Sequence, residues 1–251
     1  MTEETFYWAL LYSYIGLAIM TAVSLLFIAA PYGRHSRGGF GPRVPSRIGW
    51  LLMEAPASLG PLALFLLSGR RDPVTVAFLL IWQAHYVHRA FIFPFRMRAG
   101  APMPILVALM GLTFNFGNGY LNWRYLTWLA PAYPAEWLSD PRFLLGLVLF
   151  AAGMAVNQHS DWILLHLRKP GETGYKIPHG GMYRFVSCPN YLGECVEWLG
   201  WALLTWSLPG LVFALWTAAN LVPRAIAHHR DYLRRFPDYP TERRAVIPFV
   251  L

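Results

Sequence analysis

Long apolar runs separated by short polar loops dominate the pattern of the chain. A helix that crosses a bilayer needs about 20 mostly apolar residues, and runs of that length recur. The pattern predicts seven spanning helices: Phe6–Ala30, Gly49–Ser68, Pro73–Phe95, Pro102–Leu121, Phe143–Leu165, Tyr191–Ser207 and Leu208–Ala227. We expect the fourth to end in a Gly117–Gly119 break and the last two to join at a Pro/Gly turn. The predicted fold class is therefore all-α, a polytopic membrane protein with seven transmembrane helices.

Composition supports a membrane protein with a single domain. The 251 residues are 56% hydrophobic and only 14% charged, whereas soluble domains carry about 25% charged residues. The net charge of +8 could suggest nucleic acid, but the cations lie in short loops between apolar runs, so we expect no nucleic-acid partner. Cys188 and Cys195 form neither a disulfide framework nor a metal-ligand spacing. The start of the chain, with Glu3 and Glu4, does not look like a cleavable signal peptide.

The loop cations predict how the chain lies in its membrane. One set of loops holds sixteen lysines and arginines and the opposite set holds four, with Arg89 inside a span. The larger set is Arg34, Arg37, Arg43, Arg47, Arg96, Arg98, Arg168, Lys169, Lys176, Arg184, Arg224, Arg230, Arg234, Arg235, Arg243 and Arg244. Because basic loops stay on the cytoplasmic side, we expect an outside N-terminus, a cytosolic C-terminus, and a 157–194 loop open to the cytosol.

Most of the polar information lies between Asn157 and Glu194, where a Gly/Pro-rich loop joins two apolar helices. Asn157 and Asp161 are four residues apart and Arg168 lies seven beyond, so the spacing predicts one shared helical face. Two further groups repeat this spacing: Asn190 with Glu194, and Arg224 with His228 and Tyr232. Each stripe alone could be a solvated helix end. Three together favour a bulky charged ligand held between helix ends.

Two further polar residues lie within apolar segments. Glu54 is in the middle of the second, where a carboxylate is costly to bury, so we expect it to be neutral and able to donate a hydrogen bond. Tyr86 lies among His85, His88 and Arg89 in the third, where its hydroxyl could polarise a carbonyl or transfer a proton. The alternatives are a carboxyl that only packs helices and a tyrosine that only fills space.

The stretch HSDWILLHLRKPGETGYKIPHGGMYRFVSCPNYLGECVEWLGWALLTWSLP, with RAIAHHRDYLRRFPDYPTERRAVIPF after it, resembles the steroid 5-alpha-reductase family. The likeness is dense in the C-terminal half and scattered in the N-terminal half, and we expect a bacterial homologue. In that family a glutamate of the second span and the tyrosine of an HYxHR motif bind the 3-oxo group of the steroid, and they match Glu54 and Tyr86. The glutamine that usually precedes the glutamate is Met53 here.

The resemblance also implies NADPH as the cofactor, held between helices without a Rossmann domain. The matching positions are Asn157, His159, Asp161, Arg168, Tyr175, Asn190, Glu194, Arg224, His228 and Tyr232, with Lys176 where the family often has arginine. This set is chemically reasonable. Cations such as Arg168 and Arg224 suit the phosphates, and amides and carboxylates suit ribose hydroxyls and the carboxamide.

These observations predict one membrane reductase domain, residues 1–251, with helices of 6–121 on the substrate side and 143–251 binding the cofactor. Hydride would pass from NADPH to the β-carbon of a conjugated enone, a 3-oxo-Δ4 steroid, while Glu54 and Tyr86 hold its carbonyl. The steroid would enter from the surrounding lipid, and we expect a monomer in a bacterial inner membrane or an endoplasmic reticulum.

Other functions remain open at the level of sequence. A reductase of the same family acting on enoyl-CoA or polyprenal would share the cofactor residues. An isoprenylcysteine methyltransferase-like enzyme has an RHPxYxG hallmark similar to CPNYLGE at Cys188–Glu194, although Ser187-Cys188 replaces its Arg-His pair. A di-iron hydroxylase is disfavoured because the eight histidines form no HxxxH or HxxHH box. A seven-helix receptor or lipid-binding scaffold would leave the polar stripes unexplained.

Overall fold

The structure is a computed structural model that describes residues 2–28, 39–97, 102–169 and 171–251. Its chain divides into two units: residues 1–11 with 30–141, and residues 12–29 with 142–251. Each unit is described by itself. The predicted loop cations Arg34, Arg37 and Arg98, and the end of the first predicted helix at Ala30, lie outside the described residues.

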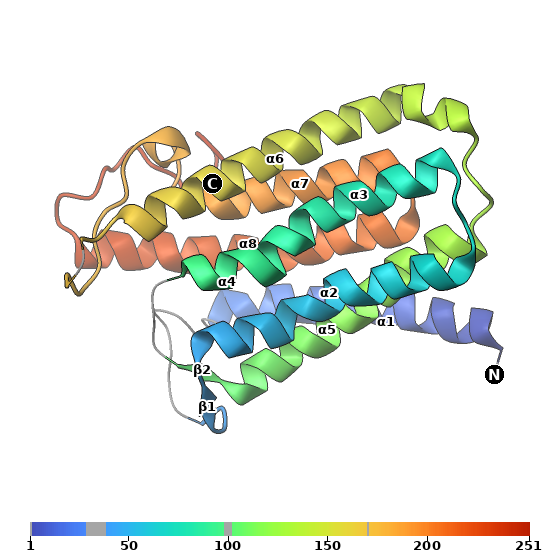
Figure 1. Cartoon of the computed structure of the whole chain (residues 1–251). Helices are drawn as coiled ribbons and strands as arrows, with labels where there is room; N and C mark the ends of the chain where they lie inside the picture. The colour runs from blue at the N-terminus through green and yellow to red at the C-terminus, as the bar shows by residue number, and fades with distance from the viewer. Residues whose placement is uncertain (1, 29–38, 98–101, 170) are drawn as a thin grey trace. The chain divides into compact units, whose positions relative to one another are not determined.

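Helices make up most of the described chain, and each of the seven predicted segments overlaps a helix (Figure 1). The α-helices are α1 (Glu3–Phe27), α2 (Ser46–Ser68), α3 (Pro73–Val87), α4 (Phe93–Arg96), α5 (Ile105–Arg124), α6 (Pro141–His166), α7 (Pro189–Thr205) and α8 (Leu208–Arg235). Short helical turns are η2 (His88–Ile92) and η3 (Tyr125–Leu129), both π-helical, and η4 (Ala135–Ser139) and η5 (Gly181–Arg184), both 3-10. The all-α class is confirmed apart from a two-residue antiparallel pair, β1 (Arg43–Val44) with β2 (Met103–Pro104).

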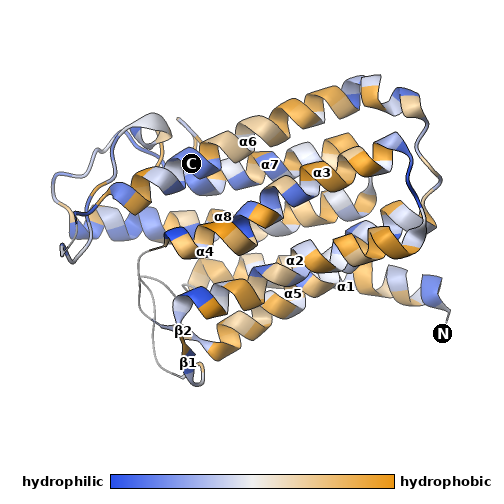
Figure 2. Ribbon diagram, in the orientation of Figure 1, coloured by the Kyte–Doolittle hydropathy of each residue, from blue (hydrophilic) through white to orange (hydrophobic). Residues whose placement is uncertain are grey.

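Within the described residues, five helical runs are long and apolar enough to cross a membrane. They are α1, α2, the continuous run Pro73–Arg96, α6 and α8. Large apolar side chains lie on the outside of these and neighbouring helices: Phe27 is 83% exposed, Leu67 77% and Phe116 68%. Figure 2 shows apolar residues along the helix lengths and a hydrophilic C-terminal end of α8. Because water would penalise so much exposed apolar surface, the chain is an integral membrane protein.

The predicted break at Gly117–Gly119 is wrong, because α5 continues through it to Arg124. The glycine serves helix packing instead. A Cβ added at Gly119 would lie 3.2 Å from Cδ of Pro61 on α2 and 3.9 Å from the Pro56 carbonyl oxygen. The small residue therefore lets α5 approach α2 closely, and an isolated glycine inside a helix is tolerated at about 1 kcal/mol.

Helices α2 and α3 form an antiparallel pair whose polar contacts follow from a proline. Pro61 has no N–H, so the Ala57 carbonyl one turn earlier lacks its helical donor. Trp82 of α3 supplies one, with Nε1 2.6 Å from the Ala57 oxygen. Beside it, Ser58 and Gln83 exchange two hydrogen bonds, of 2.6 Å and 2.8 Å. These contacts fix the register of the pair.

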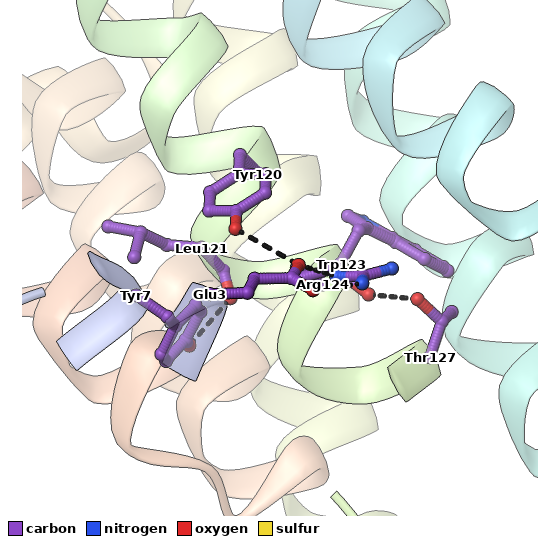
Figure 3. Close-up of polar contacts among 7 residues, drawn as sticks. All are labelled: Glu3, Tyr7, Tyr120, Leu121, Trp123, Arg124 and Thr127. Carbon is purple, nitrogen blue, oxygen red and sulfur yellow. Dashed lines mark hydrogen bonds and ion pairs between the residues drawn. The ribbon is translucent and has the colours of Figure 1, made fainter. Parts of the chain in front are cut away.

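The first turn of α1 is tied to the end of α5 within the first unit. Figure 3 shows the Glu3 carboxylate between Tyr120 and the guanidinium of Arg124, whose Nη2 donates to Oε2 at 2.7 Å. The Tyr7 hydroxyl donates to the Leu121 carbonyl at 2.8 Å. The bonds from Arg124 and Tyr7 hold the N-terminal turn against α5. Separately, Thr127 donates to the Trp123 carbonyl one turn earlier.

In the second unit, α6 and α7 pack backbone against backbone through glycines spaced seven apart. A Cβ at Gly153 of α6 would lie 2.4 Å from the Glu197 nitrogen, and one at Gly193 of α7 would lie 2.5 Å from the Asn157 nitrogen. Gly146 and Gly200 repeat the contact two turns away. Small residues are a common means of close helix packing in membranes. Here they bring the polar end of α6 directly onto the start of α7.

The C-terminal segment closes over the loop that precedes α7. Ser187 and Cys188 donate backbone hydrogen bonds to the carbonyls of Arg244 and Ala245, at 2.8 Å and 3.1 Å. The buried Arg243 guanidinium donates to the Pro178 carbonyl at 3.0 Å. A small apolar cluster of Cys188, Ala225, Ala245 and Val246 completes the contact. The loop and the end of the chain therefore hold one another in place at the start of α7.

Candidate functional site

The two residues predicted to grip a carbonyl lie at the same level of the α2–α3 pair. Glu54 is one turn before Ala57, and Tyr86 is one turn after Trp82, whose Nε1 donates to the Ala57 carbonyl. One turn further, Trp50 Nε1 donates to the Arg89 carbonyl at 3.1 Å. Because these antiparallel contacts bracket them on both sides, Glu54 and Tyr86 come from different helices to one height in the first unit.

Glu54 also contacts α5 through a residue that sequence reasoning missed. The buried Asn115 lies 3.3 Å from Oε2 of Glu54 and donates to the Met53 carbonyl at 2.7 Å, in both cases through Nδ2. The Met53 side chain lies against Gly111, where an added Cβ would be 2.7 Å from its Cγ. The signal was present in the sequence, since Asn115, Asn118 and Asn122 follow a helical spacing within an apolar segment.

Tyr86 is buried in an aromatic setting. Its ring centroid lies 4.9 Å from those of both Trp82 and His85. The predicted cation Arg89 stacks on Trp50 at 4.6 Å, after the chain passes into the π-helical turn η2. Such turns are frequent at functional sites. The proline at 94 explains this one, because it cannot donate the helical hydrogen bond to Ala90.

In the second unit, three of the predicted cofactor residues form one hydrogen-bonded group between α6 and α7. Asn157 Nδ2 donates to the Asn190 carbonyl at 2.9 Å, and Asn190 Nδ2 donates to Asp161 Oδ1 at 3.1 Å. Asn157 and Asp161 are both buried. Glu194 lies one turn beyond Asn190 on α7. The four-residue spacing of Asn157 and Asp161 on α6 therefore brings both side chains to Asn190 of α7.

The third stripe lies on α8 and reaches the same end of α7 through Tyr191. Arg224 Nη2 donates to the Tyr191 hydroxyl at 2.9 Å, and His228 Nε2 lies 3.4 Å from the same oxygen. Tyr232, one turn further, is buried and stacks on Tyr239 at 5.1 Å. Tyr191 is a second residue that sequence reasoning missed as a contact, although it stands inside the CPNYLGE segment.

The loop residues of the predicted set are more dispersed, and one expectation is wrong. Helix α6 ends at His166, so Arg168 does not share a helical face with Asn157 and Asp161. A helix usually ends before a proline, and the sequence has Pro170 and Gly171 here. The Arg168 guanidinium instead donates to the Gly174 carbonyl at 3.1 Å.

The remaining loop positions have separate partners. Lys176 forms an ion pair with Glu172, and Arg235 lies 4.6 Å over the exposed Tyr175 ring. His159, exposed on α6, stacks on Trp162 at 6.4 Å and borders Gly181, where an added Cβ would be 2.6 Å from its Cε1. Gly181 has a φ of +49°, so the backbone passes the imidazole in a conformation that favours glycine.

The donor set of the second unit fits a dinucleotide phosphate. It combines a guanidinium, an imidazole, two amides and two carboxylates on three helices, the groups that phosphates, ribose hydroxyls and a carboxamide require. Burial raises the pKa of the Tyr183 phenol well above its usual range, and the nearby Asp161 charge adds to this shift.

Comparisons with known proteins bear on this arrangement. Residues 101–251 match the sequence model of a family described as 3-oxo-5-alpha-steroid 4-dehydrogenase. The 3-oxo-5-alpha-steroid 4-dehydrogenase 1 of Macaca fascicularis is 46% identical over 222 residues, which cover 87% of this chain and 84% of that protein. The Steroid 5-alpha-reductase DET2 of Gossypium hirsutum is 45% identical over 255 residues, covering 99% and 98%. The rat 3-oxo-5-alpha-steroid 4-dehydrogenase 1 is 44% identical over 241 residues, covering 94% and 92%.

Proposed function

Because the chain belongs to the 3-oxo-5-alpha-steroid 4-dehydrogenase family, we propose that it reduces the 4,5 double bond of a 3-oxo-Δ4 steroid with NADPH. The observation that carries this proposal is that Glu54 and Tyr86 lie at the same height along the antiparallel α2–α3 pair. A carboxyl and a phenol held at one height on two helices would offer two donors to a single carbonyl oxygen. That is the requirement for polarising an enone.

Glu54 and Tyr86 act on the substrate carbonyl in this proposal. When the double bond accepts hydride at its β-carbon, negative charge moves to the 3-oxo oxygen. Two preorganised donors stabilise that enolate, and removal of one such donor typically costs about 10²–10³ in rate. Protonation at the α-carbon then completes the reduction, with Tyr86 or a water as the source of the proton.

The cofactor cluster of the second unit supports NADPH rather than NADH. When bound, NADPH supplies the hydride. Arg224 on α8 and the loop cations Arg168 and Lys176 would hold its phosphates. Asn157, Asp161, Asn190 and Glu194 would bind ribose hydroxyls and the carboxamide, with His159, Tyr175, His228 and Tyr232 beside them. The hydrogen bonds between Asn157, Asp161 and Asn190 already orient these groups, so little side-chain ordering is needed on binding.

The membrane arrangement is part of the same proposal. All seven helices span the bilayer, and the C-terminus and the 157–194 loop face the cytosol, where dinucleotide cofactors are found. The steroid enters from the lipid. A monomer is sufficient for this reaction, because the residues assigned to the substrate and to the cofactor all belong to one chain. The bacterial origin, and the choice between an inner membrane and an endoplasmic reticulum, remain predictions.

A substrate panel tests the proposed function. Purified protein in detergent or nanodiscs is given NADPH with a 3-oxo-Δ4 steroid, an enoyl-CoA or a polyprenal, and NADPH oxidation and product mass are followed. We expect turnover of the steroid with a gain of two hydrogens. Turnover of only the enoyl-CoA or the polyprenal would assign the chain to a different substrate within the same chemistry. Transfer of a methyl group from a methyl donor without NADPH oxidation would contradict reduction altogether.

A further inference from the structure

The buried amide of Asn115 on α5 reaches across to α2 beside Glu54. Its Nδ2 contacts two oxygens: the Met53 backbone carbonyl at 2.7 Å and Glu54 Oε2 at 3.3 Å. A backbone carbonyl only accepts hydrogen bonds, so the contact with Met53 requires the amino group of the amide to point this way. The two hydrogens of that group then account for both contacts. The orientation of Asn115 is therefore set by the backbone of α2, independently of Glu54.

We infer that Asn115 is a positioning residue that fixes which oxygen of the Glu54 carboxyl is presented to the substrate. The inference rests on the proposed function of Glu54. In a neutral carboxyl one oxygen is carbonyl-like and the other carries the proton. The amide hydrogen of Asn115 goes to Oε2, and the carbonyl-like oxygen is the better acceptor. The proton is therefore carried by Oε1, which makes Oε1 the donor to a substrate carbonyl.

The packing of α2 against α5 explains why the amide comes from this position. The side chain of Met53 lies against Gly111, one turn before Asn115, so it fills the interface rather than assisting Glu54. Gly119, one turn after Asn115, allows the close approach at Pro61. Between these two contacts the helices are near enough for a short amide to cross.

Because Asn115 acts through Glu54, its removal has a specific kinetic signature. Asn115→Leu keeps the approximate size and removes both hydrogen bonds, and a misplacement of about 1 Å at a catalytic group can cost up to about 100-fold in rate. We expect kcat to fall by roughly 10- to 100-fold, with unchanged affinity for NADPH. The steroid KM should change less than kcat, since the donor is most important when charge develops on the oxygen.

A double-mutant cycle separates positioning from mere support of the fold. Turnover of a 3-oxo-Δ4 steroid is measured for the wild type, Asn115→Leu, Glu54→Ala and the double mutant. Asn115→Asp, which keeps size and polarity but replaces the amino group by a carboxyl oxygen, serves if the leucine variant is poorly folded. Asn122→Leu is the matched control, a buried asparagine on the same helix whose amino group bonds to Asn118 of α5 itself.

The inference predicts that Asn115→Leu causes almost no further loss of kcat once Glu54 is alanine. Asn122→Leu should lower the thermal stability of the protein and change kcat little. Independent losses that multiply in the double mutant would overturn the positioning role while leaving Glu54 as a catalytic residue. Wild-type turnover in Asn115→Leu would also overturn it. Wild-type turnover in Glu54→Ala is a different result, because it would contradict the proposed function itself.

Discussion

Substitution of Gly193 by alanine tests the link between helix packing and the cofactor cluster. The new Cβ would lie 2.5 Å from the Asn157 nitrogen and 2.6 Å from the Gly153 oxygen, whereas ordinary contact begins at 3.4 Å. The difference between 3.4 Å and 2.5 Å is about 0.9 Å, and both atoms are backbone. Side-chain rotation cannot relieve the clash, so α6 and α7 must separate by about that distance.

The expected energy follows from this displacement. Overpacking typically costs about 1–3 kcal/mol. A separation near 0.9 Å would also break the bond from Asn157 to the Asn190 carbonyl, now 2.9 Å, at about 0.5–1.5 kcal/mol. Alanine returns about 1 kcal/mol through its higher helix propensity. The net loss is about 2 kcal/mol, which lowers Tm by about 4–8 °C in a protein of this size.

Thermal unfolding in detergent and NADPH titration measure the two consequences separately. Gly193→Ala should lower both Tm and NADPH affinity, because Asn157 moves away from Asn190. Gly200→Ala, whose Cβ would be 2.5 Å from the Phe150 nitrogen, should lower Tm alone. Gly16→Ala on α1 meets nothing within 4 Å and should be neutral or slightly stabilising. A Gly193→Ala protein with wild-type Tm and wild-type NADPH affinity would refute this reasoning.

Three further substitutions address other parts of the account. Asp161→Ala removes the acceptor of Asn190 and should weaken NADPH binding in titrations while the protein still folds; unchanged affinity would make Asp161 purely structural. Arg224→Gln should weaken the binding of NADPH more than that of NADH, by about 1.5–3 kcal/mol if a charge-assisted contact with the 2′-phosphate is lost. Equal losses for the two cofactors would exclude a contact with the 2′-phosphate. Trp82→Phe leaves the Ala57 carbonyl without its donor and should lower the free energy of unfolding by about 1–3 kcal/mol. Adding Pro61→Ala supplies a backbone N–H to that carbonyl and should restore stability; if it does not, the proline explanation is wrong.

The helices could be predicted because their determinants are local. Apolar runs near 20 residues identify them, and the four-residue spacing of Asn157 with Asp161 and of Asn190 with Glu194 places polar side chains on single faces. The hydrogen bonds among Asn157, Asp161 and Asn190 agree with that spacing. The roles of Glu54 and Tyr86 came from family resemblance, and they remain proposals.

Two expectations are wrong for different reasons. Glycines at 117 and 119 can indicate a break, but a glycine also permits close approach, and the residue that decides between these meanings, Pro61, is distant in sequence. The spacing of Asn157 and Asp161 predicts a face that continues to Arg168, whereas the helix ends at His166. There the Pro170-Gly171 pair is the stronger signal, because a helix usually ends before a proline.

Contacts between helices could not be obtained from the sequence, because they depend on register. No local sequence pattern indicates that Asn115 of α5 contacts Glu54 of α2. Nor does one indicate that Tyr191 accepts a hydrogen bond from Arg224 and lies beside His228. Such pairs follow from where glycines and prolines let helices approach. They become visible only when the helices are packed.

The most direct test of the central claim is single-turnover reduction of a 3-oxo-Δ4 steroid by Glu54→Gln, Glu54→Ala and Tyr86→Phe, with NADPH affinity measured alongside. We expect wild-type NADPH affinity in all three, turnover reduced by about 10²–10³ in Glu54→Ala and Tyr86→Phe, and a smaller loss in Glu54→Gln, which keeps a donor. If Glu54→Ala and Tyr86→Phe both reduce the steroid at the wild-type rate, the carbonyl is held elsewhere and the account is wrong.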